Sequence, residues 1–103
     1  MDKLKFPITR NRFRYDLVKR HDNWCVVSQE NLAYPECPVH YELWRIRIKK
    51  GGTYKGKDFP AREVMPPTES WGRDGFTYLR LDDCLTDFAK RANLPNMGHK
   101  LEL

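Results

Sequence analysis

An α+β fold, with an antiparallel sheet of four to five strands and one C-terminal helix packed on one face, is the architecture that this sequence predicts. Three observations favour it. Several short segments alternate apolar and polar residues with a period of two, which is typical of half-buried strands. Glycine, proline, Asp and Asn residues separate these segments. One segment near the C-terminus has instead the period of an amphipathic helix.

The first strand pair is predicted at residues 12–20 and 24–29. In the first of these segments every second residue from Phe13 to Leu17 is apolar. Residues 21–23 (His-Asp-Asn) are expected to form the turn, because Asp and Asn tolerate left-handed backbone and hydrogen-bond to their own main chain. The two segments together predict a hairpin.

The third strand is predicted at residues 41–49, where the alternation of apolar and polar side chains is strictest. A connection with two prolines, residues 30–40, precedes it. Gly51-Gly52 is expected to supply the following hairpin turn, because glycine reaches positive φ at low cost. A fourth strand is expected within residues 54–65, with Phe59, Ala61 and Val64 directed inward. Its proline confines it to a sheet edge or a bulge.

The last strand is predicted at residues 76–80 and the helix at residues 82–92. Cys84, Phe88 and Ala92 are spaced by four residues and fall on one helical face. Acidic residues stand at the start of this segment and basic residues at its end, an order that complements the helix dipole. The segment is followed by Asn and Pro, which end helices.

Length and composition predict one small domain, residues 1–103, with a polar surface. Residues 1–11 show little periodicity and are expected to form an N-terminal arm, and residues 94–103 a C-terminal tail. Aromatic residues make up 13% of the chain, which is too many for a typical disordered protein.

The net charge of +5 is unevenly distributed. Residues 1–57 hold 13 Lys or Arg and 6 Asp or Glu, so they carry +7, whereas residues 58–103 hold 6 and 8 and carry −2. A basic half beside a slightly acidic half favours a polyanionic partner for the first half.

Three cysteines are an odd number and lie far apart, so they indicate no disulfide framework. The first residues lack the apolar core of a secretion signal, and no apolar run is long enough to span a membrane. These features predict a cytoplasmic protein with no membrane partner.

Strand alternation predicts a cationic sheet face. Arg12 and Arg14 lie opposite the apolar side of the first strand, and three further cations lie opposite Trp44 and Ile46 in the third. We expect the helix to cover the apolar sides, which leaves the cations and one aromatic residue on the open side. The residues of this predicted basic face are Arg12, Arg14, Tyr41, Arg45, Arg47 and Lys49.

Cations that contact phosphates, with an aromatic residue that stacks on a base, are how sheet surfaces hold single-stranded nucleic acid. The predicted function is therefore a small basic, non-enzymatic binding protein that contacts nucleic acid or a nucleic-acid-handling complex. Two other interpretations of the basic face stay open: a solvated face that acids such as Asp16 neutralise, or a surface for an acidic protein.

The alternative function is a protein–protein interaction or inhibitor module, such as a phage or mobile-element accessory protein that occludes a host protein. Its apolar anchors would be Trp71, in a turn beside Gly72, and the loop at residues 65–67. Packing of Trp71 over a sheet edge is the other interpretation of that residue. A second copy of the chain, covering a free sheet edge or face, is a further candidate partner.

Metal binding and catalysis are both weakly supported. Two His and two Cys have the ligand types of a zinc site: His21, Cys25, Cys37 and His40. Cys37 and His40 have a metal-like spacing, but His21 is expected in a turn and Cys25 in a strand, so these two side chains would diverge. A thiol–imidazole pair would have no orienting group. Adjacent acids at the helix start, Asp82 and Asp83, are more typical of a helix terminus than of acid–base catalysis. We therefore predict no enzyme activity, no metal and no cofactor.

Overall fold

A computed structural model describes residues 2–94 of the chain. Eight short strands are followed by a 3-10 turn, a ninth strand and a helix, in the order β1 (Ile8–Arg10), β2 (Phe13–His21), β3 (Trp24–Asn31), β4 (His40–Arg45), β5 (Arg47–Lys49), β6 (Gly52–Tyr54), β7 (Lys57–Phe59), β8 (Arg62–Val64), η1 (Thr68–Ser70), β9 (Gly75–Tyr78) and α1 (Leu81–Arg91). The predicted C-terminal tail, residues 94–103, lies outside the described residues except for Leu94.

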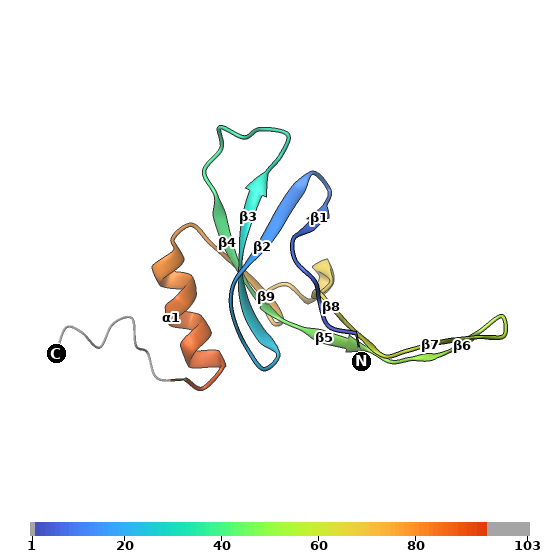
Figure 1. Ribbon diagram of the computed structural model, residues 1–103. Coiled ribbons are helices and arrows are strands. Elements are labelled where there is room, and N and C mark those ends of the chain that lie inside the picture. Colours follow the sequence, from blue (N-terminus) through green and yellow to red (C-terminus); the bar gives the residue numbers. More distant parts are fainter. Residues whose placement is uncertain (1, 95–103) are drawn as a thin grey trace.

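Five strands form one antiparallel sheet in the order β1-β2-β3-β4-β9, and α1 packs against β3, β4 and β9 (Figure 1). The predicted fold class, an antiparallel sheet with one C-terminal helix on one face, is therefore confirmed. The helix contains the face expected from its periodicity, because Cys84, Phe88 and Ala89 are buried. It ends at the predicted place: Asn93 adopts a left-handed φ of 59°, and the Leu94 amide donates to the Ala89 carbonyl.

Two-residue turns set the register of the first three strands. Asn11 and Arg12 both have positive φ, as a type I′ turn requires, and they join β1 to β2. Asp22 and Asn23 join β2 to β3, as predicted, in the register that pairs His21 with Trp24. The pairing of β2 with β3 shifts after Leu17, where a bulge re-aims the following side chains.

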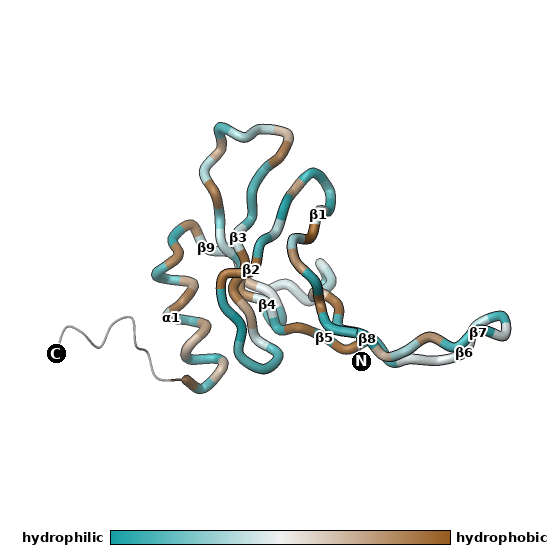
Figure 2. The backbone as a smooth tube through the Cα atoms, viewed as in Figure 1, coloured by the Kyte–Doolittle hydropathy of each residue, from teal (hydrophilic) through white to brown (hydrophobic). Residues whose placement is uncertain are grey.

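Apolar side chains cover both faces of the central strands. Figure 2 shows hydrophobic residues on these strands and along the helix. On the helix side, Val26 and Leu43 pack against Cys84 and Phe88. On the opposite side, a second cluster contains Tyr15, Cys25, Val27, Trp44 and Ile46, all of them buried. The sheet therefore has no wholly open face over β3 and β4.

This arrangement corrects the predicted faces of the third strand. The helix covers the side of Tyr41 and Leu43, whereas we expected it over Trp44 and Ile46. Alternation defines two faces but does not say which one the helix takes, and here both faces of β4 carry large apolar residues. The predicted strand at residues 41–49 is also divided into β4 and β5 at Ile46.

The N-terminal segment belongs to the sheet and is not a separate arm. Strand β1 pairs with β2, and Leu4, Phe6 and Ile8 pack onto the cluster around Trp44. This segment covers the sheet face opposite the helix. Its apolar residues alternate over too short a stretch to predict a strand.

Residues 47–64 form a long hairpin that projects from the sheet, and we call it the β arm (Figure 1). Strand β5 pairs with β8 at its base, and β6 pairs with β7 further out. The predicted turn at Gly51-Gly52 is wrong: the chain reverses at Lys55-Gly56, and Gly51 lies between β5 and β6. Phe59, which we expected to point inward, is 51% exposed.

Candidate nucleic-acid interface

The β arm owes its shape to two local features of the sequence. Lys55 and Gly56 have φ values of 50° and 77°, so β6 and β7 are joined by a type I′ turn. At Gly51 a Cβ atom would lie 2.4 Å from the Phe59 carbonyl oxygen and 2.8 Å from the Ala61 nitrogen. Only glycine permits this approach, which brings the two strands together between the two ladders.

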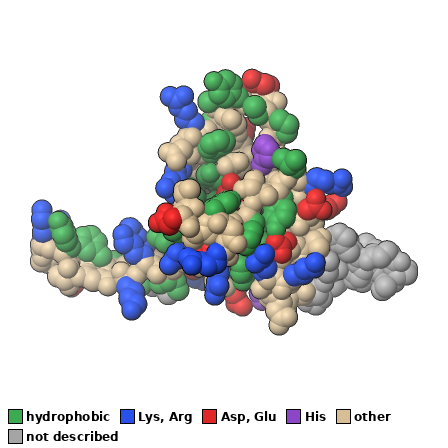
Figure 3. Space-filling model, turned by 180° about the vertical axis from the view of Figure 1, so that it is seen from behind, with side chains coloured by type: hydrophobic (Ala, Val, Ile, Leu, Met, Phe, Trp, Pro, Cys, Tyr) green, Lys and Arg blue, Asp and Glu red, His purple; other side chains and the backbone are tan. Residues whose placement is uncertain are grey.

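Most of the net charge of the protein resides on the β arm. Its residues include six Lys or Arg and two Asp or Glu, a net charge of +4 out of the chain's +5. Every residue from Arg47 to Pro60 is exposed. Figure 3 shows Lys and Arg side chains distributed along the arm. A projecting strand pair with this charge is surrounded by a positive electrostatic potential.

Five of the six cations on the arm have no acidic partner. Within residues 2–94 these five cations form no ion pair: Lys49, Lys50, Lys55, Lys57 and Arg62. The acid nearest the tip, Asp58, instead accepts a hydrogen bond of 2.7 Å from the Thr53 hydroxyl. The arm therefore presents its cations uncompensated, unlike a solvated face on which charges of both signs alternate.

The base of the β arm is fastened to the sheet by charge-assisted hydrogen bonds. Arg20, on β2, donates to both carboxylate oxygens of Glu63 at 2.7 and 2.6 Å. The Leu4 amide donates to the same carboxylate at 3.0 Å. These bonds hold the pKa of Glu63 at about 2, because each of them favours the charged form. On the other strand, Arg47 lies 3.7 Å from the buried carboxylate of Asp74.

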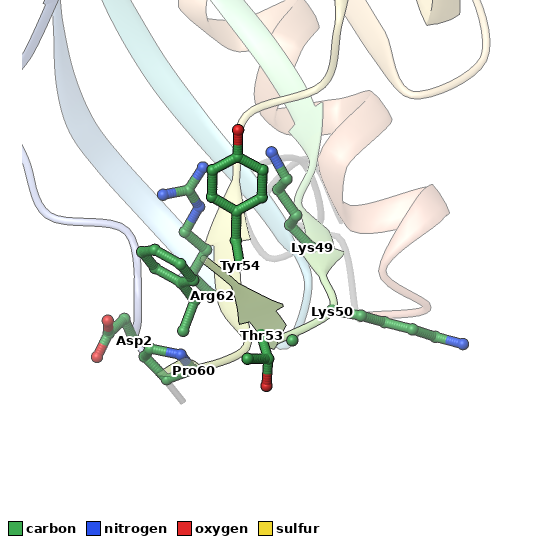
Figure 4. Close-up of a pocket in the computed structure, with 9 residues that line it drawn as sticks. Asp2, Lys49, Lys50, Thr53, Tyr54, Pro60 and Arg62 are labelled. Carbon is green, nitrogen blue, oxygen red and sulfur yellow. The ribbon is translucent and has the colours of Figure 1, made fainter. Parts of the chain in front are cut away.

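A groove of about 580 Å³ opens on one side of the arm near its base (Figure 4). Cationic and aromatic side chains dominate its lining: Lys49, Lys50, Tyr54, Phe59 and Arg62. Tyr54 is 63% exposed and belongs to neither core cluster. The lining has the two components of a surface for single-stranded nucleic acid, cations and an accessible aromatic ring.

The structure does not bring the predicted basic face together. Arg47 and Lys49 lie on β5 in the arm, but Arg12 lies in the β1–β2 turn. Arg14, on β2, donates to the Asp16 carboxylate at 3.0 Å, so an acid neutralises it as the alternative interpretation expected.

The other two residues of the predicted basic face lie on the helix side of β4. Tyr41 is half-buried and packs against the cluster beneath α1. Arg45 stacks on the Trp24 ring, with its guanidinium carbon 5.8 Å from the ring centroid. Arg91 lies over the same ring at 5.9 Å. Arg45 is therefore engaged in aromatic packing on the main body. On the arm, Lys55 makes a comparable contact, with its Nζ atom 5.4 Å from the Tyr54 ring centroid.

Trp71 and residues 65–67 contribute mainly to the packing of the fold. The Trp71 indole Nε1 donates to the Thr77 hydroxyl at 3.1 Å, and its ring lies so close to Gly75 that a Cβ atom there would overlap it. The side chain is 37% exposed, which fits the interpretation that it packs over a sheet edge. Pro66 is fully buried, and Met65 packs against the Trp44 cluster.

The four residues with the ligand types of a zinc site do not converge. His21 pairs with Trp24 at one end of β3, whereas His40 pairs with Gln29 towards the other end. Residues 2–94 contain no group of three His, Cys, Asp or Glu close enough to hold a metal ion. Burial raises the pKa of Cys25 to about 12, so its thiol is protonated at neutral pH and is a poor nucleophile.

The connection between β3 and β4 presents a second exposed surface. Three large apolar side chains on it are 41% to 60% exposed: Leu32, Tyr34 and Val39. Its backbone is ordered by the Asn31 side-chain oxygen, which accepts hydrogen bonds from the amides of Ala33 and Tyr34.

Sequence reasoning missed most of the arm cations and the exposed Tyr54. A signal for them exists in the segment Thr53-Tyr-Lys-Gly-Lys-Asp-Phe59, because a Lys-Gly pair with alternating flanks is compatible with a two-residue hairpin turn. Gly51-Gly52 gave a stronger turn signal four residues earlier, and Pro60 argued against a regular strand.

Comparison of the chain with models of protein families, with curated proteins and with solved structures found no significant match. Within residues 2–94, no helix has the length and apolar character needed to cross a membrane.

Proposed function

We propose that this chain is a small basic, non-enzymatic binding protein and that its β arm contacts nucleic acid. The observation that carries the proposal is the set of five unpaired cations on an exposed strand pair that projects from the sheet. Cations on such a ribbon neutralise phosphates, and a two-stranded ribbon has dimensions that fit the major groove of DNA.

The base of the arm is also held rigidly against the main body. Glu63 and Arg47 tie its base to Arg20 and Asp74 of the main body, so the cations are held at defined positions near the base. Their attraction for phosphates is sequence-independent, and binding through them weakens as salt rises.

The experiment is a fluorescence-anisotropy titration of labelled single- and double-stranded oligonucleotides at several salt concentrations. The arm variant is Lys50→Gln/Lys55→Gln/Lys57→Gln, and the matched control removes three exposed cations elsewhere, Arg12→Gln/Lys19→Gln/Lys90→Gln. We expect the arm variant to bind on the order of 100-fold more weakly at 0.1 M salt, with the salt slope on duplex reduced by about 2 to 3.

The control should lose far less affinity, although the net charge changes equally. Equal losses in both variants would show that only overall charge matters and would refute the role of the arm. Absence of binding by the wild-type protein, even at low salt, would refute nucleic acid as the ligand.

A cytoplasmic location is part of the same proposal. The cysteines Cys25, Cys37 and Cys84 are free thiols, as is usual in a reducing compartment. Separation of cell fractions followed by detection of the protein tests this part.

The β3–β4 connection favours one second candidate, a protein–protein interaction or inhibitor module. It holds Leu32, Tyr34 and Val39 exposed on an ordered loop, which is how apolar anchors are presented to a partner. This candidate predicts binding to a host protein that depends only weakly on salt. The Leu32→Ser/Tyr34→Ser variant should lose this binding, and the arm variant should retain it. Retention by the loop variant would contradict it.

A further inference from the structure

The groove at the base of the β arm has a chemistry more specific than general charge. Lys49 and Arg62 are directly opposite each other in the β5–β8 ladder, so their side chains share one face of the ribbon. Like charges in this position repel each other. Within the described residues neither cation has an acidic partner within ion-pair distance, although Asp2 also lines the groove.

Asp2 is held in the groove by its backbone rather than by its charge. Its amide donates to the Ala61 carbonyl at 3.1 Å, and its carbonyl accepts from the Glu63 amide at 2.8 Å. In Figure 4 its carboxylate points away from Lys49. An anion between Lys49 and Arg62 would therefore relieve a repulsion that the protein itself leaves uncompensated.

An aromatic ring accompanies this pair of cations. Tyr54 lines the same groove as Lys49 and Arg62, whereas in Figure 4 Lys50 extends away from these side chains. Tyr54 and Phe59, which also lines the groove, are 63% and 51% exposed and contribute to neither core cluster. The Lys55 Nζ atom lies 5.4 Å from the Tyr54 ring centroid, a cation–π contact that still leaves this residue mostly exposed. An exposed aromatic ring beside cations can stack against a flat ligand.

We propose that this groove binds an unpaired nucleotide, with its phosphate between Lys49 and Arg62 and its base stacked on the Tyr54 ring. The proposal rests on the proposed function and specifies the nucleic acid. In a duplex both faces of each base are covered by neighbouring base pairs, so only an unpaired base can offer a face to Tyr54. The groove therefore favours single strands, or unpaired positions within a duplex, over regular double helix.

The test compares a labelled 12-nucleotide oligothymidylate with a 12-base-pair duplex at one salt concentration. The variants are Tyr54→Ala, Tyr54→Phe and Lys49→Gln/Arg62→Gln, and the matched control is Tyr34→Ala, which removes an equally exposed ring from the β3–β4 connection. Thermal unfolding of each variant establishes that the sheet is intact.

We expect Tyr54→Ala to weaken the single strand about 10-fold and the duplex less than 2-fold, because stacking is lost and the charges are kept. Tyr54→Phe keeps the ring and should retain single-strand affinity. Lys49→Gln/Arg62→Gln should weaken both ligands, and Tyr34→Ala neither.

Two results would overturn the inference in distinguishable ways. If the wild-type protein binds both ligands and Tyr54→Ala changes neither, or both equally, the arm binds nucleic acid by charge alone and the groove has no role for a base. If the wild-type protein binds neither ligand, the proposed function itself fails together with this inference.

Discussion

The five-stranded sheet and the β arm both contain aromatic and charged residues, but they differ in how far these side chains are buried and paired. In the sheet, Trp44 is fully buried and its indole Nε1 donates to the buried Glu42 carboxylate at 2.8 Å. No buried side-chain nitrogen or oxygen in the described part of the chain lacks a hydrogen-bond partner. In the arm, Lys49 is exposed without an acidic partner, and the Phe59 ring is exposed and belongs to neither core cluster. The polar and aromatic side chains of the sheet are engaged in folding contacts, whereas five cations of the arm are exposed without acidic partners.

A polar network shows how completely the sheet is satisfied. The Gln29 side-chain amide donates to the Tyr15 hydroxyl at 3.1 Å and to Glu42 at 3.0 Å. Burial raises the pKa of Glu42, because the charged carboxylate is removed from water. A buried polar network stabilises a fold only where every member has a hydrogen-bond partner, as every member of this network does.

The largest expected difference between the two regions is in the effect of removing an aromatic side chain. Trp44→Ala should lower the free energy of unfolding by about 3 to 5 kcal/mol, because it leaves a cavity beside Phe6 and Tyr15. Phe59→Ala, on the arm, should change it by no more than about 0.5 kcal/mol. Urea denaturation measures both, and Trp44→Phe serves if the alanine variant does not fold. A comparable cost for Phe59→Ala would show that the arm contributes to the core.

The junction of the two regions should show an intermediate effect. Glu63→Gln removes the charge that Arg20 and the Leu4 amide contact, and we expect a loss of roughly 1.5 to 3 kcal/mol. Asp58→Asn, an exposed acid on the same arm, is the control and should cost less than about 0.5 kcal/mol. A loss in Glu63→Gln no greater than in the control would mean that the junction does not brace the arm.

The lowered pKa of Glu63 predicts that stability depends on pH. Its folded pKa of about 2 lies below the ordinary value of 4.5, so its contribution to stability is fully present above about pH 5. That contribution is lost as the pH falls from about 5 to 2. Glu42 acts in the opposite sense, because its raised pKa favours the folded state as it is protonated. Denaturation curves at pH 6 and pH 3 should therefore show a smaller difference between wild type and Glu63→Gln at the lower pH.

The sequence predicted the sheet better than the arm for a physical reason. Strands 13–21 and 24–31 and the helix have buried faces, so burial imposed a period on their residues that could be recognised. The arm buries little, and its alternation carries no comparable constraint. Arg47 and Lys49 were recognised because they continue the alternation of β4, whereas Arg62 was not, since only the β5–β8 register places it opposite Lys49.

The predicted basic face failed for a related reason. Its residues Arg12, Arg14 and Arg45 were grouped on the assumption that one face of the sheet is open. The N-terminal segment covers the face opposite the helix through Leu4 and Phe6, and no local pattern indicates such a non-local contact. Alternation therefore located the strands but not what covers them.

The smallest expected effect concerns the tip of the arm. Lys55 has a φ of 50°, a left-handed conformation that Asn adopts more readily than Lys. Lys55→Asn should therefore stabilise the β6–β7 ladder by about 0.5 kcal/mol. If the exposed arm opens without the sheet, this gain should slow hydrogen exchange of the β6 and β7 amides and leave exchange at Val26 and Val27 unchanged.

Global unfolding of Lys55→Asn is the informative control for this last comparison. If the sheet and the arm fold as separate cooperative units, the melting temperature should stay within about 1 °C of wild type while arm exchange slows about 2-fold. A parallel rise in both would show that the contacts of Arg20 and Arg47 at the base join the arm to the cooperative unit of the sheet. Stabilising the β6–β7 ladder would then also stabilise the whole domain.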